Sequence, residues 1–424
     1  MRIAYIHQYY RNLQMPGGTR SFELARRLVG RGHEVHLITT ETTGSRRGLS
    51  WLHTRNDDGI DVHWFSVPYS NHMSYARRIR AFGEFAIAAA AKATALRPDL
   101  VLATSTPLTV AIPGMVASRL RRVPFVFEVR DLWPEVPIEM GILRNPVAKF
   151  AAGALATLAY RNAAEVVALS PGMAQGVTAR SPGTPTTVVP NASDLELFST
   201  GGDAARLFRA SQDWLRDRPL VVYVGTLGTV NGVGYLVRLA AAVRKLDSDV
   251  RFLIVGDGKE WRQTRTLAAE FGVLDTTLRI WPEMPKADVP AILSAATIAT
   301  SVCLPLPCLQ HNCANKFFDA LAAGRPIVIN YGGWQRDLLS ESGAGLMLDP
   351  YDIGGAAATL VRHLRDDVWL ARAGAAARRL AVDRFSRDLL FDRFHAVLAR
   401  AAAGGPPRYS RRGHPAREAA RGAA

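Results

Sequence analysis

The chain has 424 residues, of which 48% are hydrophobic and 21% charged, so it has the composition of a globular protein and the length for two α/β domains of about 200 residues each. Its 52 basic and 37 acidic residues leave a net charge of +15 at pH 7, which favours anionic partners such as nucleotides, pyrophosphates, nucleic acid or an acidic membrane face. Three cysteines are too few for a disulfide framework, and no run of ~18 apolar residues is present to span a membrane.

Short apolar runs alternate with helical patterns from the start of the chain. The run Ile3–Ile6 has no signal-peptide hydrophobic segment before it, so we expect a cytoplasmic protein. Apolar residues spaced three and four apart, such as Phe22, Ala25 and Val29, then indicate a helix. Continuous apolar strands between helices predict parallel strands covered on both faces, the doubly wound α/β arrangement. The strands predicted in the first half are Arg2–Ile6, Glu34–Thr39, Asp61–Val67, Leu100–Thr104, Phe125–Val129, Val166–Leu169 and Thr187–Val189.

Two glycines, Gly17 and Gly18, lie in the loop after the first predicted strand and before a helix. Paired glycines there let backbone N–H groups approach a phosphate or sugar oxygen, although they are also common in a simple tight turn. The loop is not a GxGxxG fingerprint, and no GxxxxGK[ST] motif occurs in the chain. These absences argue against a simple dehydrogenase or ATPase.

A helix expected over residues 75–97 combines apolar positions such as Ile79 and Phe82 with a cluster of Arg77, Arg78 and Arg80. A basic rim beside apolar residues suits docking on anionic lipid headgroups. The alternative is a helix that packs on the core and whose arginines are merely solvated.

The alternation stops over residues 199–218 and then resumes, which predicts a domain boundary there. We expect two Rossmann-like domains, at residues 1–200 and 201–384, then a helix at 385–401 that packs back on the first domain, and a basic disordered tail at 402–424. Two such domains leave a cleft between the carboxyl ends of their sheets. The strands predicted in the second half are Leu220–Val224, Phe252–Val255, Leu278–Trp281, Ile298–Val302, Ile327–Ile329 and Leu346–Leu348.

The first two strands of the second domain also end in glycine-containing loops. Gly225 and Thr226 follow one strand and Gly256 the next, so flexible backbone is expected at neighbouring strand ends, where a nucleotide diphosphate would lie. Cys303, Cys308 and Cys313 are evenly spaced around a histidine but match no familiar zinc pattern, so we expect no metal site.

The densest polar pattern is on a helix expected over Ala314–Ala322, closed by Gly324. Asn315 and Lys316 would lie in its first turn, where the helix dipole and an ammonium group both suit a pyrophosphate. Asp319, one turn further, could accept hydrogen bonds from a ribose diol. The alternative is an amphipathic helix with a few solvated polar residues.

In this order and spacing, these motifs resemble the retaining glycosyltransferase family 4 with the GT-B fold, over about residues 1–400. Within it the chain is most similar to the branch that assembles bacterial surface polysaccharides, in particular the N-acetyl-L-fucosamine transferases of O-antigen synthesis. The motifs that carry the resemblance are Gly17-Gly18, Arg130-Asp131-Leu132-Trp133-Pro134-Glu135, Val189-Pro190-Asn191, Gly256-Asp257-Gly258, Asn315–Pro326 and Gly332-Gly333-Trp334.

The resemblance implies roles for residues of the donor site. The family has two glutamates eight positions apart: the second, which accepts the ribose hydroxyls, corresponds to Asp319, and the first falls on His311. The loop after the first strand of the second domain lacks the family's usual cations, which leaves Lys316 as the partner of the diphosphate. The backbone at Met284 and Pro285 corresponds to the segment that reads the base edge.

The resemblance also implies catalytic residues in the first domain. Arg130 takes the place of the family's histidine near the reacting sugar, and Asp131 and Glu135 are candidates to orient or deprotonate the acceptor hydroxyl. Their alternative is a proline-rich loop with incidental carboxylates. The chain offers no obvious covalent nucleophile and no Asp-x-Asp metal motif, so we expect front-face transfer without a required metal.

The resemblance thus implies a retaining glycosyltransferase that moves a sugar, expected to be an N-acetylated amino sugar, from a UDP-sugar co-substrate to a lipid-diphosphate-linked saccharide. It would work in the cytoplasm, at the inner face of the membrane. One alternative is a UDP-N-acetylhexosamine epimerase of the same fold. Another is a basic nucleic-acid-binding protein, but no zinc pattern, RNP-like strand or helix-turn-helix signature supports it, so no nucleic-acid partner is expected.

Overall fold

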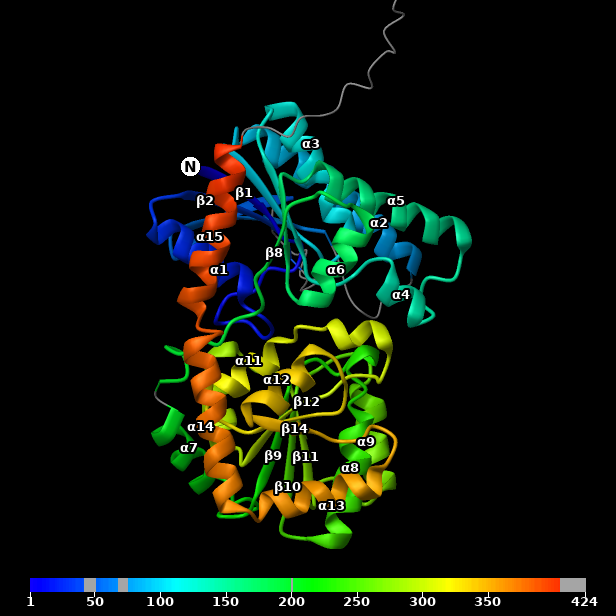
Figure 1. Ribbon diagram of the computed structural model, residues 1–424, viewed down its shortest axis with the longest axis vertical. Helices are drawn as coiled ribbons and strands as arrows, with labels where there is room; N and C mark the ends of the chain where they lie inside the picture. Colours follow the sequence, from blue (N-terminus) through cyan, green and yellow to red (C-terminus); the bar gives the residue numbers. More distant parts are fainter. Residues whose placement is uncertain (42–50, 68–74, 200, 405–424) are drawn as a thin grey trace, which may run out of the picture.

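The computed structural model describes residues 1–41, 51–67, 75–199 and 201–404, and these form two α/β domains, one above the other in Figure 1. Each domain is built on one sheet, and the two sheets contain no common strand. We call the unit around the first sheet the first domain and the unit around the second sheet the second domain. The last helix continues to Ala403, two residues into the predicted tail, and residues 405–424 of that tail lie outside the described residues.

The sheet of the first domain has the strand order β3-β4-β2-β1-β5-β6-β7-β8. Its strands pair in parallel except for β3, which runs antiparallel to β4 at one edge. The strands are β1 (Arg2–Ile6), β2 (Glu34–Thr40), β3 (Leu52–Asp57), β4 (Ile60–Phe65), β5 (Leu100–Thr104), β6 (Phe125–Val129), β7 (Glu165–Ala168) and β8 (Thr186–Val188). The helices are α1 (Arg20–Gly30), α2 (Tyr75–Ala95), η1 (Leu108–Val110), α3 (Ala111–Arg121), α4 (Glu135–Glu139), α5 (Pro146–Asn162) and α6 (Pro171–Arg180).

The sheet of the second domain is parallel throughout and has the order β11-β10-β9-β12-β13-β14. Helix α7 (Gly201–Ala210) lies between the two domains in sequence. The strands are β9 (Leu220–Val224), β10 (Arg251–Val255), β11 (Leu278–Trp281), β12 (Ile298–Ser301), β13 (Ile327–Ile329) and β14 (Gly345–Met347). The helices are η2 (Thr229–Asn231), α8 (Gly234–Leu246), α9 (Trp261–Glu270), η3 (Lys286–Asp288), α10 (Val289–Ala295), η4 (Pro307–His311), α11 (Asn315–Ala322), α12 (Trp334–Ser342), α13 (Ile353–Leu364) and α14 (Asp367–Asp383).

The last helix, α15 (Arg387–Ala403), leaves the second domain and packs on the first, against α1, β6 and β7. Figure 1 shows α14 and α15 following one another along one side of the molecule. The side chain of Ser386 accepts a hydrogen bond from the backbone of Leu389, which caps the start of α15. The chain therefore crosses between the domains twice, before α7 and before α15.

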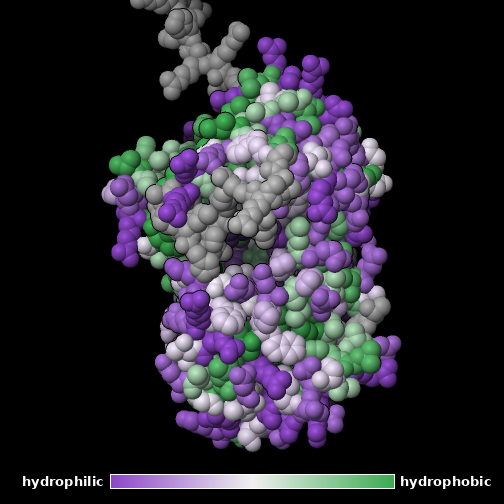
Figure 2. Space-filling model, turned by 180° about the vertical axis from the view of Figure 1, so that it is seen from behind, coloured by the Kyte–Doolittle hydropathy of each residue, from purple (hydrophilic) through white to green (hydrophobic). Residues whose placement is uncertain are grey.

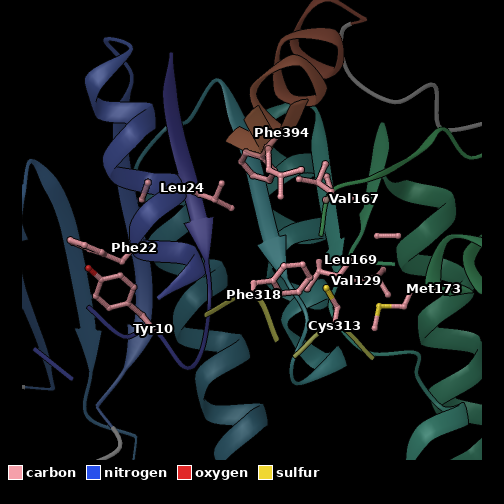
Figure 3. Packing of buried hydrophobic residues seen from close by; sticks show 14 of the residues in the cluster. Tyr10, Phe22, Leu24, Val129, Val167, Leu169, Met173, Cys313, Phe318 and Phe394 are labelled. Atoms are coloured by element: carbon pink, nitrogen blue, oxygen red, sulfur yellow. The ribbon is translucent and has the colours of Figure 1, made fainter. Parts of the chain in front are cut away.

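The hydrophobic core of the first domain continues into the second domain. Figure 3 shows Phe318 and Cys313, from the second domain, packed beside Val129 and Leu169 of the first. Phe318 also makes an edge contact with Phe385, with 5.2 Å between the ring centroids. Because these side chains are buried, the start of α11 is held firmly against the carboxyl ends of the first sheet.

The predicted fold class, two doubly wound domains, is confirmed, and each predicted strand lies within two residues of an observed one. Strand β3 was missed because Thr54, Arg55 and Asn56 are exposed or only partly buried and carry no apolar alternation. The helix predicted over 75–97 ends at Ala95. Gly324 closes α11 as predicted, with φ at +63°.

Candidate functional site

A cavity of about 270 Å³ lies between the two domains. We call it the donor cavity because it contains most of the residues predicted for the donor site. Figure 2 shows a hollow in the surface where the domains meet. Most of the wall comes from the second domain, and the loop after β1 supplies the rest. The predicted residues that line it are Gly17, Gly18, Gly225, Thr226, Gly256, Met284, Asn315, Lys316 and Asp319, whereas Pro285 is not part of the wall.

The loop after β1 reaches across the interface and bonds to the second domain. The backbone N–H groups of Lys286 and Ala287 donate to the carbonyl oxygens of Met15 and Leu13, at 3.2 and 3.1 Å. A Cβ atom on Gly18 would lie 2.2 Å from Nδ2 of Asn315, so the loop comes this close only because Gly18 has no side chain. The cavity is therefore closed on the side of the first domain.

The glycines of the second domain bring two strand ends together at the floor of the cavity. A Cβ atom on Gly256 would lie 1.9 Å from the carbonyl oxygen of Gly225. The backbone N–H of Gly225 donates to Val255, which ties the loop after β9 to the end of β10. Backbone rather than side chains thus forms this part of the wall, which leaves room for a ligand beside the two strand ends.

Lys316 projects from the first turn of α11 towards the loop after β9. Its Nζ donates to Oδ1 of Asn231 at 2.8 Å and lies 5.1 Å from the centre of the Tyr223 ring. Burial lowers the pKa of Lys316 to about 8, since no carboxylate in the described chain pairs with it. An anion in the cavity would supply the missing counter-charge.

Asp319 is buried and already has a partner. Nζ of Lys286 donates to its Oδ2 at 2.5 Å, and the two side chains are 6% and 11% exposed. Lys286 also lines the donor cavity. The carboxylate is thus held in one orientation at the cavity wall, with its second oxygen available to accept further hydrogen bonds.

A second cavity of about 220 Å³ adjoins the first, and Asn231, Asn315 and Lys316 line both. We call it the acceptor-side cavity because Asp131, a residue predicted to act on the acceptor hydroxyl, is part of its wall. Its wall contains Arg130 and Asp131, which directly follow β6. The carboxyl end of β6 and the first turn of α11 therefore face the same cavity. The ammonium of Lys316 therefore stands where the two cavities meet.

Buried polar neighbours hold Arg130 in place. The backbone N–H of Arg130 donates to Ser105 at 2.9 Å, and its Nη1 lies 3.3 Å from Nε2 of His7. Burial, followed by the charge of Arg130, lowers the pKa of His7 well below its usual value, so this imidazole is neutral. Burial raises the pKa of Asp131 to about 6, although Arg130 acts in the opposite direction. Asp131 can therefore exchange a proton near neutral pH.

Two predicted site residues, Glu135 and His311, lie outside both cavities. Glu135 forms an ion pair with Arg180 at the start of α4. His311 ends η4, and its ring packs on Gly172, where an added Cβ atom would lie 2.0 Å from its Nδ1. Its carbonyl oxygen accepts a hydrogen bond from Ser170 at 2.7 Å. The structure thus places His311 at a contact between the domains and not beside the donor cavity.

The Val189-Pro190-Asn191 motif holds the two domains together. Arg20 is buried, donates to Glu128 at 2.8 and 2.9 Å, and donates to the carbonyl oxygens of Val189 and Pro190. The side chain of Asn191 donates across the interface to the carbonyl oxygen of Cys313 at 2.5 Å. These buried bonds fix the carboxyl ends of the first sheet relative to α11.

Several wall residues of the donor cavity carry polar side chains that were not predicted as site residues. They are Asn231, Asp257, Glu283 and Lys286. Burial raises the pKa of Glu283, and the charge of Asp257 raises it further. Three of them are next to, or part of, sequence motifs already noted: Asn231, Asp257 and Glu283. For Lys286, the only indication in the sequence is its position directly after Met284-Pro285.

Within the described ranges, no group of three or more His, Cys, Asp or Glu side chains could hold a metal ion. Among the helices that the structure describes, none combines the length and hydrophobicity needed to cross a bilayer.

Two family models match the chain, one for each domain. A glycosyl transferase 4-like domain matches residues 17–192, and a glycosyl transferases group 1 domain matches residues 218–366. The first match contains the loop with Gly17 and Gly18, and the second contains α11 with Lys316 and Asp319. Together the two matches cover most of the chain.

The chain is similar to known glycosyltransferases in sequence and to solved structures in fold. The alpha-D-kanosaminyltransferase of Streptomyces kanamyceticus is 24% identical over 43% of this chain and 46% of its own length, so the chain spans about half the length of the curated relatives it matches. Sucrose-phosphate synthase from Thermosynechococcus elongatus has a TM-score of 0.74 at 18% identity, covering 95% of this chain and 99% of that one. Anabaena HepE in complex with UDP-glucose has a TM-score of 0.70 at 18% identity, covering 94% and 100%. The structural likenesses show a common fold.

Proposed function

Because the chain belongs to the glycosyltransferases of the GT-B fold, we propose that it transfers a sugar from a UDP-sugar to a lipid-diphosphate-linked saccharide, with retention at the anomeric carbon. In this proposal the domain at residues 201–384 binds the donor, the domain at 1–200 binds the acceptor, and the product is a bacterial surface polysaccharide. The observation that carries the proposal is the Lys316 ammonium, which lies at the junction of the two cavities and has no carboxylate partner among the described residues.

The residues that line the donor cavity would each contact one part of a UDP-sugar. The diphosphate would lie at the first turn of α11, where the helix dipole and the Lys316 ammonium favour negative charge. The second carboxylate oxygen of Asp319 would accept from the ribose hydroxyls, and the backbone beside Met284 would face the base. The Anabaena protein of the same fold was solved with UDP-glucose, which supports a UDP-sugar as co-substrate.

Catalysis would be largely electrostatic. As the bond between the sugar and the diphosphate breaks, negative charge grows on the leaving oxygen, and Lys316 already lies on the side of the acceptor. Asp131 faces the same space and would take the proton of the attacking hydroxyl. Attack from the face that the diphosphate leaves gives retention without a covalent intermediate. No step of this route needs a metal.

The surface of the first domain supports a lipid-linked acceptor. Ile79 and Ile87 on α2 are 52% and 76% exposed, and Val147 and Phe150 on α5 are 74% and 79% exposed. Figure 2 shows hydrophobic residues mixed with hydrophilic ones over this domain. Apolar side chains with basic neighbours are typical of helices that lie at a membrane surface, and we propose peripheral contact with the inner membrane face.

The basic neighbours on α2 are the predicted Arg77 and Arg80, which are exposed, whereas the side chain of Arg78 lies outside the described part of the chain. Replacing all three with Glu should abolish co-sedimentation with anionic liposomes. If binding is unchanged, α2 is not the membrane contact.

A screen of UDP-, GDP- and TDP-sugars by thermal shift tests the donor, because a ligand of the native state raises the melting temperature. The stabilising donor is then offered with an undecaprenyl-diphosphate-linked sugar. Transfer should require both Asp319 and Lys316, so Asp319→Ala and Lys316→Ala should abolish it. Activity in either variant would refute the donor-site assignment, and epimer formation from the UDP-sugar alone would identify an epimerase of the same fold.

A further inference from the structure

A separate cavity of about 560 Å³ lies in the second domain, away from the donor cavity and without a residue in common with it. We call it the arginine cavity. Its walls come from α7, from the turn between α10 and β12, from the turn between α11 and β13, and from α14. Its volume is typical of a site for a small molecule.

Three arginines line the arginine cavity: Arg206, Arg209 and Arg325. Ser294 and Thr297 add hydroxyl groups, and the rest of the described wall is glycine, alanine, proline and leucine. No carboxylate is part of that wall. Arg206 also forms an ion pair with Asp203 on α7, where the two side chains are 82% and 83% exposed. The cavity thus has a positive lining, and the carboxylates that interact with its arginines, Asp203 and Asp217, lie outside its wall.

Among the three arginines of this cavity, Arg325 is the one whose guanidinium has no partner in the described part of the chain. Its Nε is buried without a hydrogen-bond partner, and within the described ranges its side chain forms no hydrogen bond or ion pair. Burial, followed by the charge of Arg209, lowers the pKa of Arg325. A partly buried arginine beside a second cation is costly unless an anion joins it.

Two carbonyl groups at the ends of α10 and α11 accept hydrogen bonds from arginines other than Arg325. Arg209 donates to the carbonyl oxygen of Ala295 at 2.6 and 3.0 Å, at the end of α10. Arg378 donates to the carbonyl oxygen of Ala322 at 2.5 Å, at the end of α11. The two helix ends beside the cavity are therefore already capped, and Arg325 has its donors left for a ligand.

We propose that the arginine cavity binds the phosphate group of a small phosphorylated molecule, with Arg325 as its main contact. A guanidinium suits a phosphate because its planar fork of N–H donors can form two parallel hydrogen bonds. The hydroxyls of Ser294 and Thr297 lie in the same wall, and the small residues leave room for a carbon skeleton attached to the phosphate. This site is distinct from the donor site and does not depend on the proposed transfer.

Isothermal titration calorimetry with inorganic phosphate, and then with glycerol 3-phosphate, tests the proposal on the full chain at constant ionic strength. Phosphate could also bind beside Lys316, so the titration is carried out on Arg325→Gln and on Lys316→Ala. We expect Arg325→Gln to weaken phosphate binding about tenfold or more, and Lys316→Ala to retain it. Arg262→Gln, which changes an exposed arginine of α9, is the matched control and should bind as the wild type does.

The stability of Arg325→Gln separates loss of a ligand from loss of the fold. Because Arg325 has no partner among the residues that the structure describes, the variant should unfold at the wild-type temperature or above it when phosphate is absent. UDP should still stabilise it. Phosphate should then raise the melting temperature of the wild type more than that of the variant. Equal phosphate affinity in the wild type and Arg325→Gln overturns the site, and so does loss of phosphate binding in Lys316→Ala alone.

Discussion

The ammonium of Lys286 lies 2.5 Å from the carboxylate of Asp319, and both groups are almost fully buried at the wall of the donor cavity. Lys286 begins η3, and its own backbone N–H is bonded to Met15 in the loop of the first domain. One residue therefore touches both the proposed ribose ligand and the loop that closes the cavity. Lys286 links the position of that loop to the position of Asp319.

The ion pair gives a prediction that separates stability from binding. Lys286→Met leaves a buried carboxylate without its partner, so it should lower the free energy of unfolding by about 3–5 kcal/mol. The double variant Lys286→Met/Asp319→Leu removes both charges and should recover most of that stability in urea unfolding. Calorimetry should still show UDP affinity at least tenfold below the wild type, because no ribose acceptor remains. Wild-type affinity in the double variant would remove Asp319 from the donor site.

The lowered pKa of Lys316 predicts a pH dependence of donor binding. The free protein loses the ammonium proton near pH 8, whereas a bound diphosphate favours the charged form and raises that pKa. Affinity for a UDP-sugar should thus be greatest below pH 7 and fall by up to tenfold per pH unit above about 8. Lys316→Arg stays charged over this range, so its affinity should not fall in the same way. Parallel profiles for the two proteins, measured by calorimetry from pH 6.5 to 9.5, would contradict the assignment.

The close approach of Gly256 to Gly225 gives a prediction about the floor of the donor cavity. In Gly256→Ala the added carbon would lie 1.9 Å from a backbone oxygen, which cannot rotate away. The strand ends must separate, so we expect a loss of about 3 kcal/mol or more in urea unfolding and weaker UDP binding. Gly83→Ala is the control, because Gly83 lies inside α2 with no atom within 4 Å, and it should gain about 0.5–1 kcal/mol. Equal stability of the two variants would show that the strand ends are not this close.

The strands were predictable because most are buried on both faces. Parallel strands of this kind have continuous apolar runs in their sequences. Lys316 was predictable as an anion ligand because it lies in the first turn of a helix, where the helix dipole also favours negative charge. Lys286 was not, since its partner lies 33 positions away in sequence and no periodicity links a loop residue to a helix. His311 was placed by spacing along the chain, but the 3₁₀ turn of η4 directs its ring to Gly172. Local patterns thus predicted the helix at the site, whereas the pairs that orient it come from tertiary structure.

The two carboxylates predicted in the loop after β6 can be told apart by their pH dependence. Asp131 faces the acceptor-side cavity with a pKa of about 6, and as a base it acts only when deprotonated, so kcat/KM for transfer should rise through pH 6 and level off above it. Asp131→Asn should lower kcat by about 10²- to 10⁴-fold, abolish this rise, and leave UDP affinity within about twofold of the wild type, since Asp131 does not line the donor cavity. Glu135→Gln should retain the rise, because Glu135 is paired with Arg180 outside both cavities. If the rise through pH 6 persists in Asp131→Asn and disappears in Glu135→Gln, the roles of the two carboxylates are reversed.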